Sequence, residues 1–423
     1  MDEEKTSPLQ VQLHLLLDRR KQQSRLRSLK ASPEGSIDFS SNDFLSLSSS
    51  PIVKAIFLDE LQNIPRLSST GSRLLDGNSS YAENLERDIA KFHNSPAGLL
   101  TNSGFDANVG IFSCLPQPGD IVIYDELIHA SVHDGIKASR AGASIPFAHN
   151  SVLHLKSVLE AIVSKSSASV PFNLFIAVES VYSMDGDLAP LIEIVQLIEA
   201  LFPDKNAHLI VDEAHATGLY GEKGRGRVCD LGLENKVFVR LHTFGKALAC
   251  NGAIILCTPL TRQYLINYAR PLIYTTFMSF PALAAIKAVY TFMAQGRTEQ
   301  LAKELTSLIT LLYSNLRALR DKYSASNSTQ NLLRTPSECP KSPIISLLTS
   351  DPRGLAQYCQ RAGFVVRAIV APTVPEGFER VRVCLHAANT SAQAEKFVQI
   401  LQTWIEQESH KSQKLSEVVG ARL

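Results

Sequence analysis

A lysine, an acid and a histidine that follow apolar segments are the residues best suited to carry chemistry. Lys246 ends the sequence Thr-Phe-Gly-Lys, and Asp212 and His215 lie upstream within Val-Asp-Glu-Ala-His. A lysine amine can form a Schiff base with an aldehyde, an acid can keep a pyridine nitrogen protonated, and an imidazole can donate to a phenolic oxygen. Together these residue types indicate chemistry on pyridoxal 5'-phosphate (PLP).

The sequence around Lys246 favours a reactive amine. Thr243 supplies a hydroxyl suited to a phosphate, and the segment from Ala247 to Gly252 is small and mostly apolar. Such a flank desolvates the amine and lowers its pKa toward nucleophilic use. A lysine that follows a glycine is usually a surface residue, so this interpretation depends on the other polar residues of the chain.

Three more polar segments follow predicted strands. Residues 101–108 are small and polar, and backbone N–H groups between a strand and a helix can bind an anion, so Gly104 and Phe105 are the expected phosphate donors. His129 follows a second strand, where its ring could stack on the cofactor. Ser183 follows a third. Their joint occurrence at strand ends indicates one site.

The elements that would position these residues indicate an α/β fold. Near-continuous apolar runs suit strands that are buried on both faces of a mostly parallel sheet. Ligands of such sheets gather outside the carboxyl ends of the strands, where Asp212 is expected. The runs are Asp120–Tyr124, Asn173–Val178, His208–Asp212 and Ala253–Cys257.

Four parts are expected along the chain. Pro281 to Arg320 reads as long helices, and three further strands are expected near residues 344–348, 365–370 and 380–385. The parts are an N-terminal helix and arm at 1–50, a large cofactor-binding domain at 51–285, a smaller α/β domain at 286–408 and a polar tail at 409–423.

Composition is that of an ordinary globular chain. Of 423 residues, 45% are hydrophobic and 20% are charged, and the net charge of +1 gives no field that would attract nucleic acid. No apolar run reaches the length needed to cross a membrane. The seven cysteines contain no Cys-x-x-Cys, so neither a disulfide framework nor a metal site is expected. The expected partners are therefore small molecules.

The C-terminal tripeptide predicts a location. The chain ends in Ala421-Arg422-Leu423, which resembles the Ser-Lys-Leu peroxisomal address. The N-terminus is acidic and lacks a following apolar segment, which argues against a signal or transit peptide. We expect a peroxisomal protein if the tripeptide is used, and a cytoplasmic one otherwise.

Taken together, the motifs resemble those of the α-oxoamine synthases, which are PLP-dependent enzymes of fold type I. The resemblance covers roughly residues 35–405 and implies a large, mostly parallel seven-stranded sheet domain with a smaller C-terminal α/β domain. It rests on Ser41-Asn-Asp-Phe-Leu, Gly71-Ser-Arg-Leu, Ser103-Gly-Phe, Phe147-Ala-His-Asn, Ser183-Met-Asp-Gly-Asp, Asp212-Glu-Ala-His, Gly221-Glu-Lys-Gly-Arg-Gly, Thr243-Phe-Gly-Lys, Leu272-Ile-Tyr-Thr-Thr and Pro372-Thr-Val-Pro.

The resemblance implies a role for each cofactor contact. Lys246 would be the Schiff-base lysine, His129 the stacking ring and Asp212 the partner of the pyridinium nitrogen. His215 would contact the phenolic oxygen, which completes the expected catalytic set. The remaining cofactor contacts would be Gly104, Phe105, Ser183 and Thr243.

The resemblance also implies contacts beyond one subunit's cofactor. Thr275 and Thr276 would reach the phosphate of a neighbouring subunit, which implies a homodimer with shared active sites. Arg27 and Thr373 would contact substrate.

One position departs from the pattern of the family. An arginine that binds the carboxylate of the amino acid usually lies three residues before the threonine of Pro-Thr-Val-Pro, but this chain has Val370 there. Valine offers no donor to a carboxylate. Arg367 is one candidate to replace it, although strand alternation places it on the opposite face unless the strand bulges. Arg382 is the second candidate.

The reaction that the resemblance implies is a decarboxylative condensation. Pro372-Thr-Val-Pro-Glu-Gly favours the branch of the family that condenses L-alanine with pimeloyl-CoA in biotin biosynthesis. A sister synthase with another acyl-CoA or amino acid, serving secondary metabolism, stays open. An aminotransferase or decarboxylase would need no acyl-CoA, and a non-catalytic subunit would be expected to lack Lys246.

Overall fold

The computed structural model describes residues 7–23, 25–29, 31–165, 172–323 and 332–420. Contacts divide the chain into two units, residues 1–36 and residues 37–423. The first unit contains helix α1 (Pro8–Gln22), which is exposed along its whole length. Its start is stabilised by a capping box, in which the Ser7 hydroxyl accepts from the Gln10 N–H and the Gln10 side chain accepts from the Ser7 N–H.

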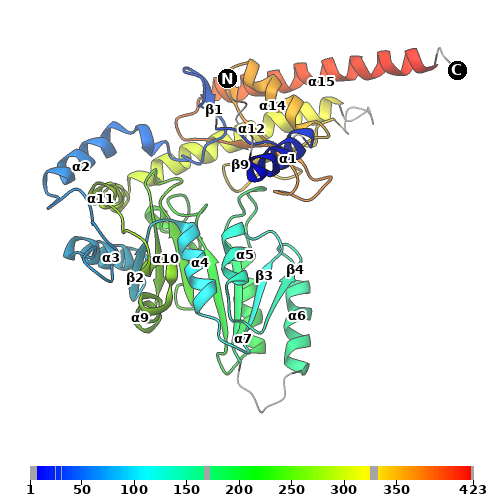
Figure 1. Ribbon diagram of the computed structural model, residues 1–423. Coiled ribbons are helices and arrows are strands. Elements are labelled where there is room, and N and C mark those ends of the chain that lie inside the picture. Colours follow the sequence, from blue (N-terminus) through cyan, green and yellow to red (C-terminus); the bar gives the residue numbers. More distant parts are fainter. Residues whose placement is uncertain (1–6, 24, 30, 166–171, 324–331, 421–423) are drawn as a thin grey trace. The chain divides into compact units, whose positions relative to one another are not determined.

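A seven-stranded sheet organises the second unit (Figure 1). The strand order is β2-β8-β7-β6-β5-β3-β4, and β3 to β7 run parallel while β8 is antiparallel to both neighbours. This confirms the predicted mostly parallel sheet. The strands are β2 (Ala97–Thr101), β3 (Ile121–Asp125), β4 (Ala143–Phe147), β5 (Leu174–Glu179), β6 (Ala207–Asp212), β7 (Val239–Thr243) and β8 (Ala253–Cys257).

Helices cover both faces of this sheet, and its inner strands are largely buried, whereas most of edge strand β4 is exposed. Every residue of β5 is buried. The helices α4 (Gly104–Cys114), α5 (Ala130–Lys137) and α9 (Pro259–Tyr268) share a core with one face. The helices α6 (Val152–Lys165) and α7 (Leu191–Leu201) share a core with the other face.

A third core joins the sheet to the C-terminal region. Strands β2 and β8 contribute to it, together with α2 (Pro51–Gln62), α3 (Ser80–Phe92) and α11 (Phe280–Ala294). Helix α11 packs against both α2 and α3. Two short helices, α8 (Arg227–Asp230) and α10 (Arg270–Ile273), and the 3-10 turns η1 (Leu47–Ser49) and η2 (Glu222–Gly224) connect these elements.

The C-terminal region is built on a three-stranded antiparallel sheet of order β11-β12-β9. The chain passes through α12 (Arg297–Tyr323), β9 (Ile344–Leu348), α14 (Pro352–Arg361), β10 (Phe364–Val365), β11 (Arg367–Ile369), β12 (Arg380–Cys384) and α15 (Ser391–Gly420). Helices α12 and α15 pack against each other along this sheet (Figure 1).

Several elements run across the expected boundaries between parts. Strand β1 (Ile37–Asp38) pairs in parallel with β10, so the segment after residue 36 belongs with the C-terminal region and not with the N-terminal helix. The expected boundary at 285 falls inside α11, which runs without a break. The expected tail at 409–423 continues α15 to Gly420, and the tripeptide 421–423 lies outside the described residues.

None of the helices in the described part of the chain is both long enough and apolar enough to cross a membrane.

Candidate active site

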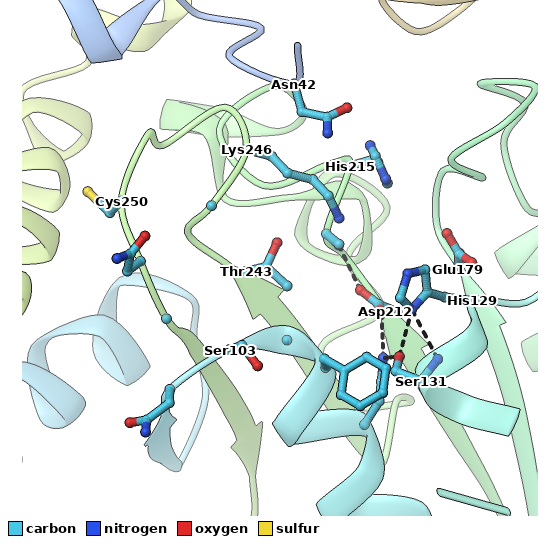
Figure 2. A pocket seen from close by; sticks show the side chains of 18 residues that line it. Asn42, Ser103, His129, Ser131, Glu179, Asp212, His215, Thr243, Lys246 and Cys250 are labelled. Carbon is cyan, nitrogen blue, oxygen red and sulfur yellow. Dashed lines mark hydrogen bonds between the residues drawn. The ribbon is translucent and has the colours of Figure 1, made fainter. Parts of the chain in front are cut away.

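A pocket of about 360 Å³ lies at the carboxyl edge of the parallel strands (Figure 2). It collects residues from the ends of β2, β5, β6 and β7, from the loop between β3 and α5, and from the start of α4. The lining residues are Asn42, Asn102, Ser103, Gly104, Phe105, Asn108, His129, Ser131, Glu179, Asp212, Ala214, His215, Thr243, Gly245, Lys246, Cys250, Asn251 and Gly252.

Asp212 is buried at the floor of this pocket and is held by two donors. One carboxylate oxygen accepts from the Ala214 N–H at 2.9 Å, and the other accepts from the Asn108 amide at 2.9 Å. Glu179 is the cross-strand neighbour of Asp212 and is 3% exposed. Burial, with the charge of Asp212, raises the pKa of Glu179 to about 8. Asp212 therefore has a neighbour that is mostly uncharged at neutral pH.

Lys246 is positioned by the tight loop between β7 and β8. Phe244 is fully buried and anchors this loop, because its N–H donates to Gly252 O at 2.9 Å and its carbonyl accepts from the Cys250 N–H at 2.7 Å. Burial lowers the pKa of Lys246, and nearby Arg382 acts in the same direction against Asp212 and Glu179. The amine is therefore easier to deprotonate than an ordinary lysine, as a nucleophile or base requires.

Two histidines face the same space and are biased toward the neutral form. Burial lowers the pKa of His215 well below its ordinary value, and the charges of Lys246 and Arg382 add to this. Its Nδ1 is buried without a hydrogen-bond partner in the described structure. Burial also lowers the pKa of His129, whose Nδ1 accepts from the Ser131 N–H at 3.2 Å. Figure 2 shows both rings pointing into the pocket with Lys246 and Asp212.

The start of α4 forms an anion-binding end of the pocket. Ser103 caps the helix by accepting from the Asp106 N–H at 3.0 Å, and the first N–H groups of a helix have no intrahelical acceptor. A side chain at Gly104 would place its Cβ 2.3 Å from Thr243 Cγ2, so only glycine allows this close approach. The Thr243 hydroxyl is buried without a partner among the described residues.

Three predicted cofactor contacts lie outside the lining of the pocket. Ser183 belongs to the loop after β5, where its carbonyl accepts from Arg382 Nε at 2.7 Å. Thr275 and Thr276 follow α10 and are joined to the pocket through Asn102, whose amide donates to Thr276 O at 2.8 Å. Thr276 is exposed, as a contact to a second subunit requires.

The predicted substrate residues are distributed unevenly. Arg382 is 8% exposed, and its guanidinium donates to Asn42 Oδ1 at 2.9 Å, which places it beside a residue that lines the pocket. Its cross-strand neighbour Arg367 is exposed, and so is Thr373 in the turn between β11 and β12. Val370 follows β11 and is partly buried. Arg27 is exposed and belongs to the N-terminal unit.

Sequence reasoning missed several lining residues. Asn108 and Ser131 bond to each other at 3.0 Å and support Asp212 and His129. Asn108 ends the polar segment 101–108 and Ser131 lies two residues after His129, but only the packing of their helices gives them these roles. Asn42 lies within the motif Ser41-Asn-Asp-Phe-Leu, which was a usable signal. Glu179 is the last residue of its apolar strand, as Asp212 is of β6, so its position was the available signal.

Comparison with known proteins establishes the family. Residues 34–401 match the aminotransferase class I and II family. The chain is 52% identical, over 412 residues, to an 8-amino-7-oxononanoate synthase of Emericella nidulans, an alignment that covers 96% of this chain and 98% of that one. The chain belongs to the α-oxoamine synthases.

Solved structures agree with the fold of this α-oxoamine synthase. An 8-amino-7-oxononanoate synthase of Francisella tularensis is 26% identical with a TM-score of 0.70, over 89% of this chain and all of that one. A serine palmitoyltransferase variant of S. paucimobilis, solved with PLP and myriocin, superposes with a TM-score of 0.79 at 24% identity, over 94% of this chain and 98% of that one. The fold is that of the type I PLP-dependent transferases.

The pocket of the α-oxoamine synthase fits PLP. Partnerless polar atoms at Thr243 and His215 face a cavity with an anion-binding helix end on one side and a buried carboxylate, Asp212, at its floor. Lys246 is the one lysine among the described lining residues. No group of three or more His, Cys, Asp or Glu residues in the described ranges is placed to hold a metal ion.

We predict that Lys246→Ala removes the covalent attachment of PLP and lowers kcat by about 100-fold or more, because general base catalysis by a positioned amine contributes that much. The check is the intact mass after borohydride reduction, which should show the reduced cofactor on the wild-type chain and not on Lys246→Ala. Lys236→Ala, which changes a surface lysine paired with Glu199, should keep the label. A labelled Lys246→Ala chain would contradict the assignment.

Proposed function

We propose that this α-oxoamine synthase condenses L-alanine with pimeloyl-CoA to give 8-amino-7-oxononanoate, CoA and CO2, a step of biotin biosynthesis. The observation that carries the proposal is the 52% identity to an 8-amino-7-oxononanoate synthase over almost the full length of both chains. The pocket supports it, because a lysine of lowered pKa, a buried carboxylate and a neutral histidine surround one cavity.

The reaction consumes one proton from solvent and needs no other reactant. PLP, when bound, supplies an electron-withdrawing ring that makes the α-carbon of the amino acid acidic. The α-carbon forms a bond to the thioester carbonyl carbon, the carbon–sulfur bond breaks, and the thiol of CoA leaves with one proton. The carboxylate of alanine then leaves as CO2, and a proton returns to the same carbon.

The residues of the chain divide this work. Lys246 removes and returns the proton at the α-carbon, for which its lowered pKa is suited. Asp212, which accepts from the Asn108 amide and the Ala214 N–H, would hold the ring nitrogen of the cofactor by a charge-assisted hydrogen bond. His215 is biased toward the neutral form, so its partnerless nitrogen can hydrogen-bond to an oxygen of the reactants. His129 offers a flat ring to the cofactor from the β3–α5 loop.

Arg382 is the best candidate to bind the carboxylate of alanine. A guanidinium has five N–H donors, and the Ser183 carbonyl and Asn42 Oδ1 take one each, which leaves others available to a ligand. Its charge also acts on Lys246 and His215, which places it near the reacting atoms. Arg367 is exposed on the neighbouring strand, so Arg382 is favoured as the replacement for the arginine expected at Val370.

We predict that the PLP-loaded enzyme releases CoA from pimeloyl-CoA only when an amino acid is present, and fastest with L-alanine. The check is a thiol assay across alanine, glycine and serine with acyl-CoA chains of several lengths. A preference for another pair would replace the proposed substrates and would point to a synthase of secondary metabolism. Turnover of amino acids without any acyl-CoA would reject the condensation altogether.

We further propose a homodimer with shared active sites. Thr275 and Thr276 would bind the phosphate held by the second copy. Large apolar side chains beside them support this, since Tyr274 is 72% exposed and Leu75 is 79% exposed. The Phe277 N–H donates to Gly71 O at 3.0 Å, which ties the two exposed segments together.

We predict that co-expression of Lys246→Ala with a chain carrying Thr275→Val and Thr276→Val restores activity above either parent. A mixed dimer contains one site in which every contributing residue is wild type. Light scattering should report a dimer for each protein. A monomer, or a mixture no more active than its parents, would contradict shared sites.

We also propose that Ala421-Arg422-Leu423 directs the enzyme to peroxisomes, with the cytoplasm as the alternative. We predict that residues 412–423 carry a fluorescent reporter into peroxisomes, while the same segment without the last three residues leaves it diffuse. Imaging of both fusions is the check, and diffuse signal from the complete segment would reject the address.

A further inference from the structure

His149 lies between the carboxylates of Asp125 and Asp187. Its Nδ1 is 2.8 Å from Asp125 Oδ1, and its Nε2 is 2.7 Å from Asp187 Oδ2. The His149 ring also packs edge-on against Tyr182, with centroids 4.4 Å apart. The residue belongs to the motif Phe147-Ala-His-Asn, for which the chemistry at Lys246 gives no role.

The first carboxylate holds the loop that presents His129. Asp125 is fully buried at the end of β3. Its oxygens accept from His149, from the Leu127 N–H at 2.9 Å and from the Asn150 N–H at 2.8 Å. Leu127 lies two residues before His129, so the position of the ring in the pocket depends on this carboxylate.

The second carboxylate holds the hairpin after β5. Val181 and Leu188 pair as an antiparallel bridge, and the Tyr182 N–H donates to Asp187 O at 3.0 Å, so residues 181–188 form one closed turn. The Asp187 side chain accepts from His149 and from the Asn150 amide at 2.5 Å. The hairpin is thereby attached to the segment after β4.

The same hairpin holds the arginines of β12 on its other side. The Ser183 carbonyl accepts from Arg382 Nε, and Asp185 forms an ion pair with Arg380, which is 3% exposed. A displacement of the hairpin would therefore move the guanidinium of Arg382. His149 and Arg382 do not bond to each other, but both are bound to residues 181–188.

The charge of the imidazole suits this arrangement. Burial lowers its pKa, but hydrogen bonds and charge attraction from Asp125 and Asp187 outweigh burial and raise the pKa of His149 to about 10. The imidazole then donates from both ring nitrogens, which a neutral ring cannot do. Charge-assisted bonds of this kind are roughly twice as strong as neutral ones.

We propose that His149 is a positioning residue that, by bridging Asp125 and Asp187, fixes the 181–188 hairpin and so places Arg382 to bind the carboxylate of the amino acid substrate. The inference rests on the proposed function insofar as Arg382 is taken to bind that carboxylate. It predicts that loss of the bridge weakens binding of the amino acid specifically. A merely structural role would lower stability and leave that binding unchanged.

The test is amino acid binding to the PLP-loaded enzyme without acyl-CoA, followed by the absorbance of the cofactor. His149→Gln should raise the Kd for alanine about tenfold, as expected when a supporting contact of a bound group is lost. Its far-UV circular dichroism should match the wild type, and its KM for acyl-CoA should stay unchanged. An unchanged Kd for alanine would overturn the proposal.

A matched control exists in the same segment. His154 is exposed, and its Nδ1 accepts from the Ala148 N–H at 2.8 Å, next to His149 in sequence. His154→Gln changes the same residue type and a contact of the same loop without touching the bridge, so the Kd for alanine should not move. A tenfold rise in this variant would attribute the effect to the loop as a whole and reject the bridge.

A double-mutant cycle with Arg382→Lys tests the route. If His149 acts through Arg382, the rise in Kd for His149→Gln with Arg382→Lys should be clearly smaller than the product of the two single rises, because coupled residues are not additive. A rise in Kd for the double variant equal to the product of the two single rises would show independent effects and overturn the proposal. If His149→Gln fails to fold, Asp187→Ala removes the contact between His149 and Asp187 from the hairpin side. An unchanged Kd for alanine in that variant also overturns the proposal.

The binding test and the substrate panel can each fail independently of the other. Binding is measured without acyl-CoA, so a wrong acyl-CoA or product leaves it intact. If the panel shows no condensation but His149→Gln still weakens amino acid binding through Arg382, the positioning role stands and the proposed reaction falls. If condensation occurs and amino acid binding is indifferent to His149, the positioning role falls alone.

Discussion

One buried carboxylate, that of Asp212, organises the active site. A charge removed from water is costly unless hydrogen bonds and a counter-charge compensate. Asp212 receives a backbone N–H from Ala214 and an amide from Asn108, and Lys246 supplies the opposite charge nearby. Asn108 also donates to Ser131, which supports His129. Helix α4 and the loops after β6 and β7 therefore meet at this strand end, where they stabilise the carboxylate of Asp212.

The surrounding groups are arranged so that few other charges compete with this one. Glu179 has its pKa raised to about 8, and burial lowers the pKa values of both His215 and His129. The pKa of Glu179 lies near physiological pH, where a group can exchange a proton with little cost, while the two histidines are biased toward the neutral form and add no charge. The site thus combines the Asp212 carboxylate, which would hold the ring nitrogen of the cofactor, with neutral side chains and the Lys246 amine, which can accept a proton.

Local signals predicted the fold and the cofactor end of the pocket, but not the substrate end. Apolar runs that stop at a polar residue are visible in sequence, so β6 and the site of Asp212 could be predicted. Asn108 could not, because its role depends on where α4 packs. The parallel pairing of β1 with β10 joins Ile37 to Phe364, a contact that no local pattern encodes.

The valine at position 370, where the family usually has an arginine, is also explained by contacts between distant segments. An edge strand can lose an arginine without loss of ligand binding if a neighbouring strand presents another cation to the same ligand. Arg382 lies on β12, at the centre of the three-stranded sheet, and two acceptors from other segments, Ser183 O and Asn42 Oδ1, fix its guanidinium. An arginine on a central strand with two fixed bonds is better ordered than one at the end of edge strand β11, because fewer side-chain rotamers have to be lost on binding. The geometry of the carboxylate end is therefore a property of the packing between the two sheets, and no single motif records it.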